Sequence, residues 1–268
     1  WAFILVMKIQ PKAEHLSLIL AVLWSIIPLI PAFLDNSLAG SPYTDLYPSV
    51  WSLWAFQNWL EEGFRLRILN YPSGQNWYPN SIILGLIAQP MKLILPWHWI
   101  YNILLVLSRF LGCFSFLIAA RAWTKNEYSA RFLMILIACS PMVHGFSVEG
   151  ILEGTQIWPL GLYLWSVQKG YRNRSILFFF LTVISNWYYA AIVCLLGLLL
   201  SIHNTKARSS FLGVIPAVPF ILLFLSSLSP SAQIPADIIQ TMGFQWSFRH
   251  QIYSHHPILL LFPRISVG

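Results

Sequence analysis

The stretch WHWIYNILLVLSRFLGCFSFLIAA, residues 97–120, decides the fold class. Nearly all of it is apolar, and about 20 apolar residues are enough for a helix to cross the hydrocarbon core of a membrane. Arg121, Lys125 and Arg131 follow the stretch, and loops rich in Lys and Arg stay on the cytoplasmic side. The sequence therefore predicts a transmembrane helix here, with its C-terminal end facing the cytoplasm.

The composition of the whole chain agrees with this prediction. Of 268 residues, 57% are apolar and only 9% are charged, against roughly 25% charged residues in soluble domains. The mean hydropathy is +0.64, and together these values exclude an ordinary water-soluble enzyme, a disordered chain and a disulfide-rich secreted scaffold. Cys113, Cys139 and Cys194 lie inside apolar runs, without the spacing of metal ligands or of a disulfide framework.

The net charge of +7 comes mostly from basic residues in short loops between apolar runs. No basic cluster alternates with exposed aromatic residues, which argues against nucleic acid as a partner. The pattern instead indicates membrane topology.

Alternation of apolar runs and basic loops predicts an all-α, polytopic integral membrane protein with about six to seven transmembrane helices. We expect a single transmembrane domain over residues 1–268. The predicted membrane segments besides 97–120 are Leu16–Phe33, Phe132–Val148, Gln156–Gln168, Ile176–Ile202 and Phe211–Leu228.

Two apolar runs are expected to deviate from simple spans. Ile176–Ile202 has basic residues on both flanks, so we expect a hairpin of two short helices, broken near Ser185–Trp187. Ser81–Leu95 is too short to cross and is expected to be interfacial or re-entrant.

Two polar stretches are expected on the external side, at about residues 34–97 and 229–256. Within the first, Leu46–Phe64 resembles an amphipathic helix that lies in the membrane interface. Most acidic residues fall in the external segments, and we interpret this bias as functional. The start at Trp1 and a new apolar run near Pro257 suggest a fragment, truncated at least at its C-terminus.

Three acidic residues are candidates for catalysis. Asp45 follows the first predicted helix by about ten residues, so its carboxylate could act at the membrane face as a general base or metal ligand. It could equally cap the following helix, with Thr44 as an alternative cap. Glu149 and Glu153 are four residues apart and would share one face of a helix. They could share a divalent cation or a proton, or be two solvated loop acids.

Candidates for substrate binding are Arg109, His144, Trp187 and Tyr188. Arg109 is the charge predicted deepest inside a span, where such residues point to a partner or a cavity. It fits a site for phosphate or a structural arginine. His144 lies close to the two glutamates in sequence. The aromatic pair would line an apolar or sugar-binding groove, or simply pack at the interface.

A late histidine cluster could bind a metal ion or belong to a plain loop. Its members are His250, His255 and His256.

Several of these segments resemble a known family. Residues 44–56, Thr-Asp-Leu-Tyr-Pro-Ser-Val-Trp-Ser-Leu-Trp-Ala-Phe, with Leu-Asn-Tyr-Pro-Ser-Gly at 69–74, look like the opening of bacterial GT-C-like membrane proteins. Ser140-Pro141, Glu149–Pro159 and the broken segment Ser185–Tyr189 also look similar. The resemblance covers roughly residues 16–225. GT-C glycosyltransferases are polytopic enzymes that transfer sugars from polyprenyl-phosphate donors.

The resemblance implies an inverting sugar transfer at the external face of a bacterial plasma membrane. Asp45 matches the acid that serves as base or metal partner in the first loop, and Glu149 or Glu153 would supply a second carboxylate. The family more often has Gly-Asp or Asp-Glu in that loop, whereas this chain has Thr44-Asp45, so dependence on a divalent metal ion stays open. The implied partners are a polyprenyl-phosphate-linked sugar and membrane lipid.

A non-catalytic transporter, flippase or assembly partner for lipid-linked glycans is the alternative. Transporters often show inverted repeats and several ionisable residues at mid-membrane. This sequence shows no repeat and one such residue, Arg109, which favours the enzyme.

Overall fold

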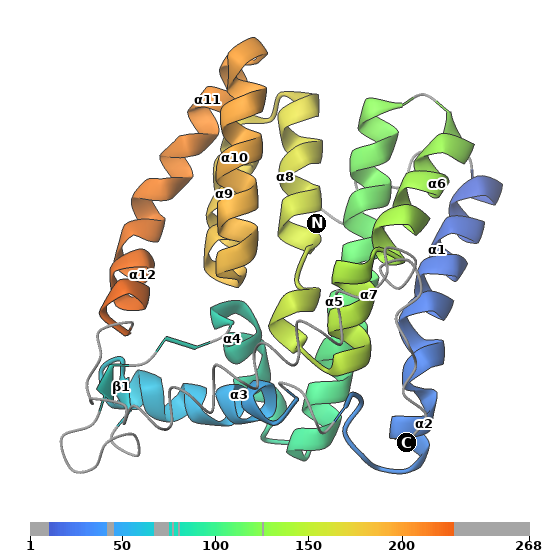
Figure 1. Cartoon of the computed structure of the whole chain (residues 1–268). Coiled ribbons are helices and arrows are strands. Elements are labelled where there is room, and N and C mark those ends of the chain that lie inside the picture. Colours follow the sequence, from blue (N-terminus) through green and yellow to red (C-terminus); the bar gives the residue numbers. More distant parts are fainter. Residues whose placement is uncertain are drawn as a thin grey trace, which may run out of the picture.

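The computed structural model is a bundle of helices with one helix lying crosswise at its lower end (Figure 1). It describes residues 11–41, 46–66, 75–76, 78–79, 81–124 and 126–227. The elements are α1 Pro11–Ile26, η1 Ile27–Leu29, α2 Ile30–Leu34, α3 Leu46–Glu61, β1 Arg65–Leu66, β2 Gln75–Asn76, α4 Ile82–Met91, α5 Trp97–Trp123, α6 Glu127–Ala138, α7 Pro141–Glu149, η2 Leu152–Thr155, α8 Trp158–Lys169, α9 Arg172–Ser185, α10 Trp187–His203, α11 Thr205–Ser210, η3 Phe211–Gly213 and α12 Val214–Ser227. The predicted helical fold is confirmed.

Helix α5 is the long helix predicted from residues 97–120, and it lies at the centre of the bundle. It packs against α1, α6 and α8. With 27 residues at 1.5 Å each, it measures about 40 Å, which exceeds the ~30 Å hydrocarbon core. Ile100, Leu104 and Leu105 on this helix are fully buried, so α5 supplies the core on which the other helices pack.

Three helical stretches are long and apolar enough to cross a membrane, namely Leu16–Leu34, Trp97–Trp123 and Ala207–Ser227. A fourth is added if Glu127–Ala138 and Val143–Glu149, bent by 43° at their break, form one span. Over the described residues this is fewer than the predicted six to seven. Helices α8, α9 and α10 have only 12, 14 and 17 residues. At 1.5 Å per residue each falls short of ~30 Å.

The break predicted near residues 185–187 is confirmed. Helix α9 ends at Ser185, α10 begins at Trp187, and the two helices pack against each other. Asn186 lies between them in extended conformation, and its side-chain oxygen accepts a hydrogen bond from the Tyr188 N–H at 2.8 Å. The Ser185 hydroxyl donates to the Thr182 carbonyl at 2.9 Å. Polar groups at the break are thus paired within the protein, as a non-polar environment requires.

The first helix is bent where Pro28 interrupts it. A proline has no N–H, so Pro28 cannot bond the carbonyl of Trp24, four residues earlier. The Arg109 Nη2 of α5 donates to that carbonyl at 2.8 Å. Pro31 likewise leaves the carbonyl of Ile27, four residues earlier, without its usual helical donor. That carbonyl accepts a hydrogen bond from the Ile30 N–H instead. Arg109 therefore fastens the bend of the first helix to the centre of the bundle.

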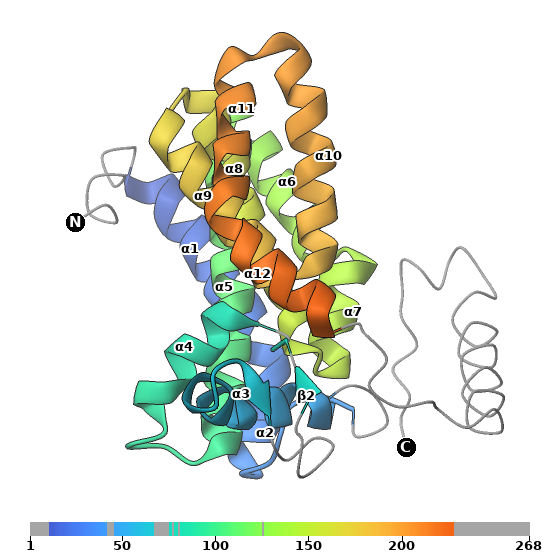
Figure 2. The same ribbon diagram turned by 90° about the vertical axis from the view of Figure 1, so that its left-hand side faces the viewer.

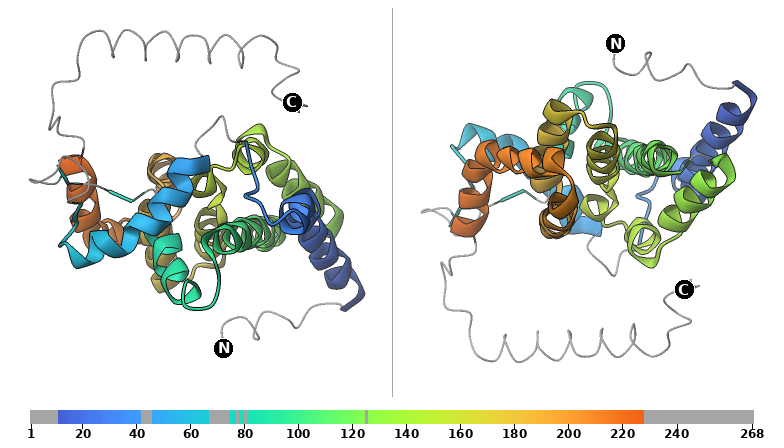
Figure 3. Two further views of the ribbon diagram at one scale, coloured as in Figure 1. Left: turned by 90° about the horizontal axis from the view of Figure 1, so that it is seen from below. Right: turned by 90° about the horizontal axis from the view of Figure 1, so that it is seen from above.

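Helix α3 runs crosswise beneath the upright helices (Figures 1 and 3). It buries Leu53, Phe56 and Trp59 and exposes Tyr47 and Trp54. This two-sided character matches the amphipathic helix predicted over residues 46–64, although the helix itself ends at Glu61.

Helix α4 packs against α3, α5 and α9. The Ser81 hydroxyl caps it by accepting the Leu84 N–H at 3.2 Å, and it contains only ten residues. Such a helix is about 15 Å long, so the prediction that residues 81–95 do not span is confirmed.

The helices are connected at the two opposite ends of the bundle (Figure 2), and these ends differ in their charged residues. The junctions α5–α6, α8–α9 and α10–α11 lie at the upper end, and the loop after α2, helix α3 and the α7–η2 turn lie at the lower end (Figure 1). The upper end carries the basic residues Arg121, Lys169, Arg172, Arg174 and Arg208, together with the acidic Glu127 at the start of α6. The acidic residues at the lower end are Asp35, Glu61, Glu62, Glu149 and Glu153, together with the basic Arg65 and Lys92. This distribution agrees with an upper end in the cytoplasm.

We expect single cysteines at the two ends to be labelled from opposite sides of the membrane. In a variant lacking the native cysteines, Ser41→Cys should react with an impermeant maleimide in intact cells. Ser129→Cys and Asn173→Cys should react only after permeabilisation. Labelling of position 129 in intact cells would reverse the proposed orientation.

Candidate functional site

The candidate site is formed around the turn that connects α7 to α8. Helix α7 ends at Glu149, and the next residue, Gly150, has a left-handed backbone with φ +80° and donates its N–H to the Phe146 carbonyl. This conformation is favourable for glycine and costly for other residues. The short helix η2, Leu152–Thr155, follows at once and contains Glu153. The expectation that Glu149 and Glu153 share one helical face is therefore wrong, because Gly150 ends the helix between them.

Gly150 is also where the first external loop contacts the bundle. A Cβ atom on Gly40 would lie only 2.6 Å from the Gly150 Cα, and one on Gly150 would lie 2.8 Å from the Tyr101 Oη. The Tyr101 hydroxyl donates to the Gly150 carbonyl at 2.5 Å, and Leu46 packs on the same spot. We call this contact of Gly40, Leu46, Tyr101 and Gly150 the glycine junction; it fixes the loop and the start of α3 against the α7–η2 turn.

A first pocket, the aromatic pocket, lies on one side of the α7–η2 turn. It has a volume of about 190 Å³ and is lined by Phe146, Ile151, Glu153, Gly154, Asn186, Trp187 and Tyr188. The rings of Trp187 and Tyr188 stack with centroids 3.7 Å apart, and both are about half exposed. The neighbouring Tyr189 is buried and its hydroxyl donates to the Gly154 carbonyl. The α9–α10 break thus presents two exposed rings beside Glu153.

The carboxylate of Glu153 is held from helix α3. Its Oε2 accepts a hydrogen bond from the Ser49 hydroxyl at 2.8 Å. Ser49 is buried and lies one helical turn after Asp45 in the sequence. Three of the predicted site residues, Glu153, Trp187 and Tyr188, therefore share one pocket, tied to the segment that follows Asp45.

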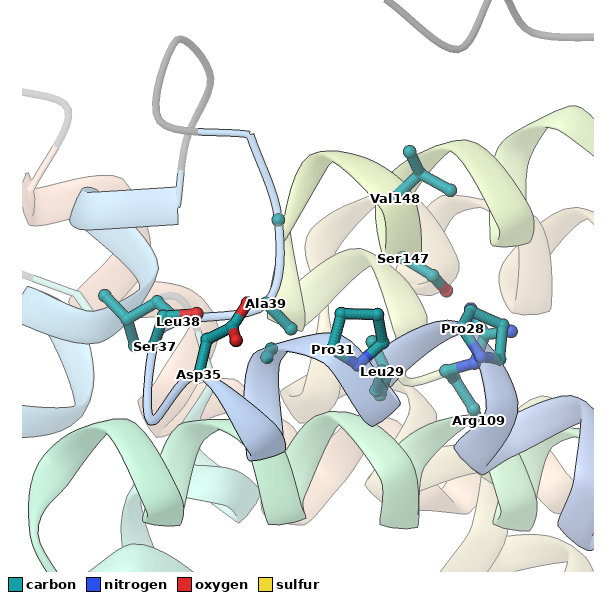
Figure 4. A pocket seen from close by; sticks show the side chains of 12 residues that line it. Pro28, Leu29, Pro31, Asp35, Ser37, Leu38, Ala39, Arg109, Ser147 and Val148 are labelled. Carbon is teal, nitrogen blue, oxygen red and sulfur yellow. The ribbon is translucent and has the colours of Figure 1, made fainter. Parts of the chain in front are cut away.

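A second pocket, the arginine pocket, lies along the bent first helix (Figure 4). Its volume is about 290 Å³, and its lining comes from residues 28–40, from Arg109 and from Ser147 and Val148 of α7. Arg109 is 3% exposed and its guanidinium lies 5.4 Å above the Trp24 ring. The ring of His144 is 5.3 Å from the same indole. The structure thus brings two of the candidate substrate-binding residues, Arg109 and His144, to the same indole ring of Trp24.

The charge of Arg109 is only partly compensated. In the part of the chain that the structure describes, the ion pairs join Glu127 to Arg121 and Arg131, and none includes Arg109. Burial of an ion costs several kcal/mol, whereas a cation–π contact returns up to about 2 kcal/mol. Arg109 Nε and His144 Nδ1 are buried without hydrogen-bond partners among the described residues. Arg109 therefore keeps charge and hydrogen-bonding capacity that the described residues do not fully use.

Other predicted site residues are not in these pockets. Glu149 is the last residue of α7 and lines neither of them. Asp45 and the cluster His250, His255 and His256 lie outside the described residues. Over the residues that are described, no three His, Cys, Asp or Glu side chains gather as metal ligands would.

The sequence analysis missed three residues that complete the pockets. Ser49 holds Glu153, Trp24 lies between Arg109 and His144, and Asp35 lines the arginine pocket. Pro28 alone gave a signal, because a proline inside an apolar span leaves a carbonyl that needs a partner. Nothing in the sequence pointed to the contact between Ser49 and Glu153.

Among the described residues, the protein is helical and has three, or four, stretches long and apolar enough to span a membrane. The arginine pocket and the aromatic pocket are both lined by residues around the α7–η2 turn. Comparison with protein-family models and with curated protein sequences finds no match for this chain.

Replacement of Gly150 by alanine should disturb the glycine junction. The left-handed backbone alone costs roughly 1–3 kcal/mol for a non-glycine residue, and the new methyl group would collide with Tyr101. We expect Gly150→Ala to lower the melting temperature of the purified protein in detergent.

Gly145→Ala is the matched control. Gly145 lies inside α7, five residues before Gly150, with nothing within 4 Å of an added Cβ, and alanine is the better helix former. Its melting temperature should stay equal or rise. Equal melting temperatures of the two variants would contradict a close contact at Gly150.

Proposed function

We propose that this chain is a membrane glycosyltransferase of GT-C type. In the proposal it transfers a hexosyl or pentosyl group from a polyprenyl-phosphate donor to an acceptor, at the external face of a bacterial plasma membrane, with about six to seven spans in the native protein. The supporting observation is the aromatic pocket, in which a carboxylate and two stacked, half-exposed aromatic rings lie together. This pocket lies at the end of the bundle that carries the acidic residues.

The aromatic pair suits a sugar substrate. Trp and Tyr offer a broad apolar surface with a polar edge, which matches a pyranose or furanose ring with C–H groups on its faces and hydroxyls on its rim. Pockets for such ligands combine apolar walls with a few placed polar groups. Here Glu153 supplies the polar group, and the Ser49 hydrogen bond orients it.

The reaction needs two functions that carboxylates can perform. One carboxylate takes the proton of the acceptor hydroxyl, whose oxygen then bonds the anomeric carbon while the bond from that carbon to the donor phosphate oxygen breaks. The leaving group is polyprenyl phosphate. We assign the base to Asp45, by resemblance, and the second carboxylate to Glu153, where its charge would stabilise the positive charge that develops on the sugar ring.

Glu153→Gln should lower sugar transfer by about 10²–10³-fold, as expected when one electrostatic contact to a transition state is removed. Glutamine keeps the size of the side chain and can still pair with Ser49, so the protein should remain folded. The assay is release of polyprenyl phosphate from a series of polyprenyl-phosphate hexoses and pentoses by the full-length protein in proteoliposomes.

Glu61→Gln is the control for Glu153→Gln. Glu61 is exposed at the end of α3 and accepts a hydrogen bond from Gln57, so transfer should be unchanged. Equal activities of Glu153→Gln and wild type would remove Glu153 from the site. Binding of the donors by wild type without any turnover would support the transporter or flippase alternative.

Asp45→Asn should remove transfer while leaving the melting temperature nearly unchanged. A positioned general base contributes about 10²–10⁴-fold, and asparagine caps a helix about as well as aspartate. Measurement of both quantities separates the two roles. Activity within about threefold of wild type would leave only the capping role.

A further inference from the structure

The arginine pocket has a charge that the fold itself does not require. The structural role of Arg109 is the hydrogen bond from its Nη2 to the Trp24 carbonyl, which Pro28 leaves without a backbone donor. A guanidinium has five N–H donors, and here Nε is buried without a partner among the described residues. A neutral amide could fill this structural role. Among the described residues the positive charge has a cation–π contact with the Trp24 ring but no ion pair.

The surroundings of Arg109 identify the kind of ligand. The pocket extends from Arg109 to Asp35 and Gly40 on the external loop (Figure 4). Ile27 and Ile30 beside it are exposed on the first helix, and Val148 is exposed on α7. Val148 lines the pocket, whereas Ile27 and Ile30 are sequence neighbours of its lining. Exposed apolar side chains next to the pocket suit hydrocarbon, and a guanidinium can donate parallel N–H bonds to two oxygens of a phosphate.

We infer that the arginine pocket binds the phosphodiester headgroup of a lipid, as a monoanion. One guanidinium neutralises one negative charge, and the carboxylate of Asp35 in the same pocket repels a second. A phosphomonoester carries about −1.5 to −2 charges at pH 7, so the pocket should prefer a diester. An anionic bulk phospholipid such as phosphatidylglycerol and a sugar-linked polyprenyl phosphate both present such a diester, whereas the diester of phosphatidylcholine is neutralised by its own choline cation.

This binding does not depend on sugar transfer. Only the choice of the sugar donor as the native lipid rests on the proposed function. The α7–η2 segment lines both pockets, with Ser147 and Val148 on the arginine pocket and Glu153 on the aromatic pocket. A lipid bound at Arg109 would therefore be separated from the proposed transfer site by the α7–η2 turn.

The test measures lipid binding to the purified full-length protein by native mass spectrometry. The probes are short-chain phosphatidylglycerol, a monoanionic diester, phosphatidic acid, a monoester, and zwitterionic phosphatidylcholine. We expect wild type to bind phosphatidylglycerol most tightly. Arg109→Gln keeps a donor for the Trp24 carbonyl but loses the charge, and should weaken that binding by at least about tenfold.

Arg208→Gln is the matched control. Arg208 also donates to a backbone carbonyl, that of Ser201, at 2.8 Å, but from an exposed position on α11. Its loss should leave phosphatidylglycerol binding unchanged. An equal loss in both variants would overturn the inference, because it would indicate general attraction of anionic lipid to a basic protein.

A second variant keeps the test decisive even if Arg109→Gln does not fold. Asp35 is exposed, so Asp35→Asn should fold, and it should raise the affinity for phosphatidic acid relative to phosphatidylglycerol by a few-fold. No change in this ratio would overturn the assignment of a monoanion.

Competition identifies the source of the diester. Displacement of phosphatidylglycerol by a polyprenyl-phosphate hexose at lower concentration would support the pocket as the donor site. Retention of phosphatidylglycerol would support a bulk phospholipid ligand. Equal binding of phosphatidylcholine and phosphatidylglycerol to wild type would overturn the inference for either source.

Discussion

The bent first helix depends on one hydrogen bond, from Arg109 to the carbonyl of Trp24. In an apolar environment an unpaired carbonyl costs several kcal/mol, and Pro28 makes this carbonyl unpaired by its missing N–H. The bond joins segments 85 residues apart and so sets where the first helix lies on α5. The arginine that makes this bond also places a positive charge inside the bundle, where it lines the arginine pocket.

A second constraint places the other pocket. At the glycine junction, residues without side chains let the backbone of the external loop approach the end of α7, where a Cβ on Gly40 would collide with Gly150. The left-handed turn at Gly150 then separates the side chains before and after it. Ser147 lies on the arginine pocket and Glu153 on the aromatic pocket. The two candidate sites are therefore built from one turn.

Much of the fold could be predicted from patterns local in the chain. The long span in α5 follows from apolar length, the break after Ser185 from basic residues on both flanks, and the short α4 from its 15-residue run. The described residues show three or four stretches long enough to span, and the predicted number of six to seven stays a prediction. The run Gln156–Gln168 was predicted as a membrane segment, whereas α8 has only 12 residues and packs against α5 and α9.

The sequence by itself determined a helical protein with stretches long and apolar enough to span a membrane, the candidate residue types at the site and the loops that carry most of the charge. Tertiary structure alone decided which of these residues meet. Glu153 joins Ser49 across 104 residues, and Arg109 and His144 meet over Trp24. Hydrophobic periodicity and charge are properties of neighbours along the chain, whereas these contacts depend on how a proline bend and a glycine turn orient separate helices.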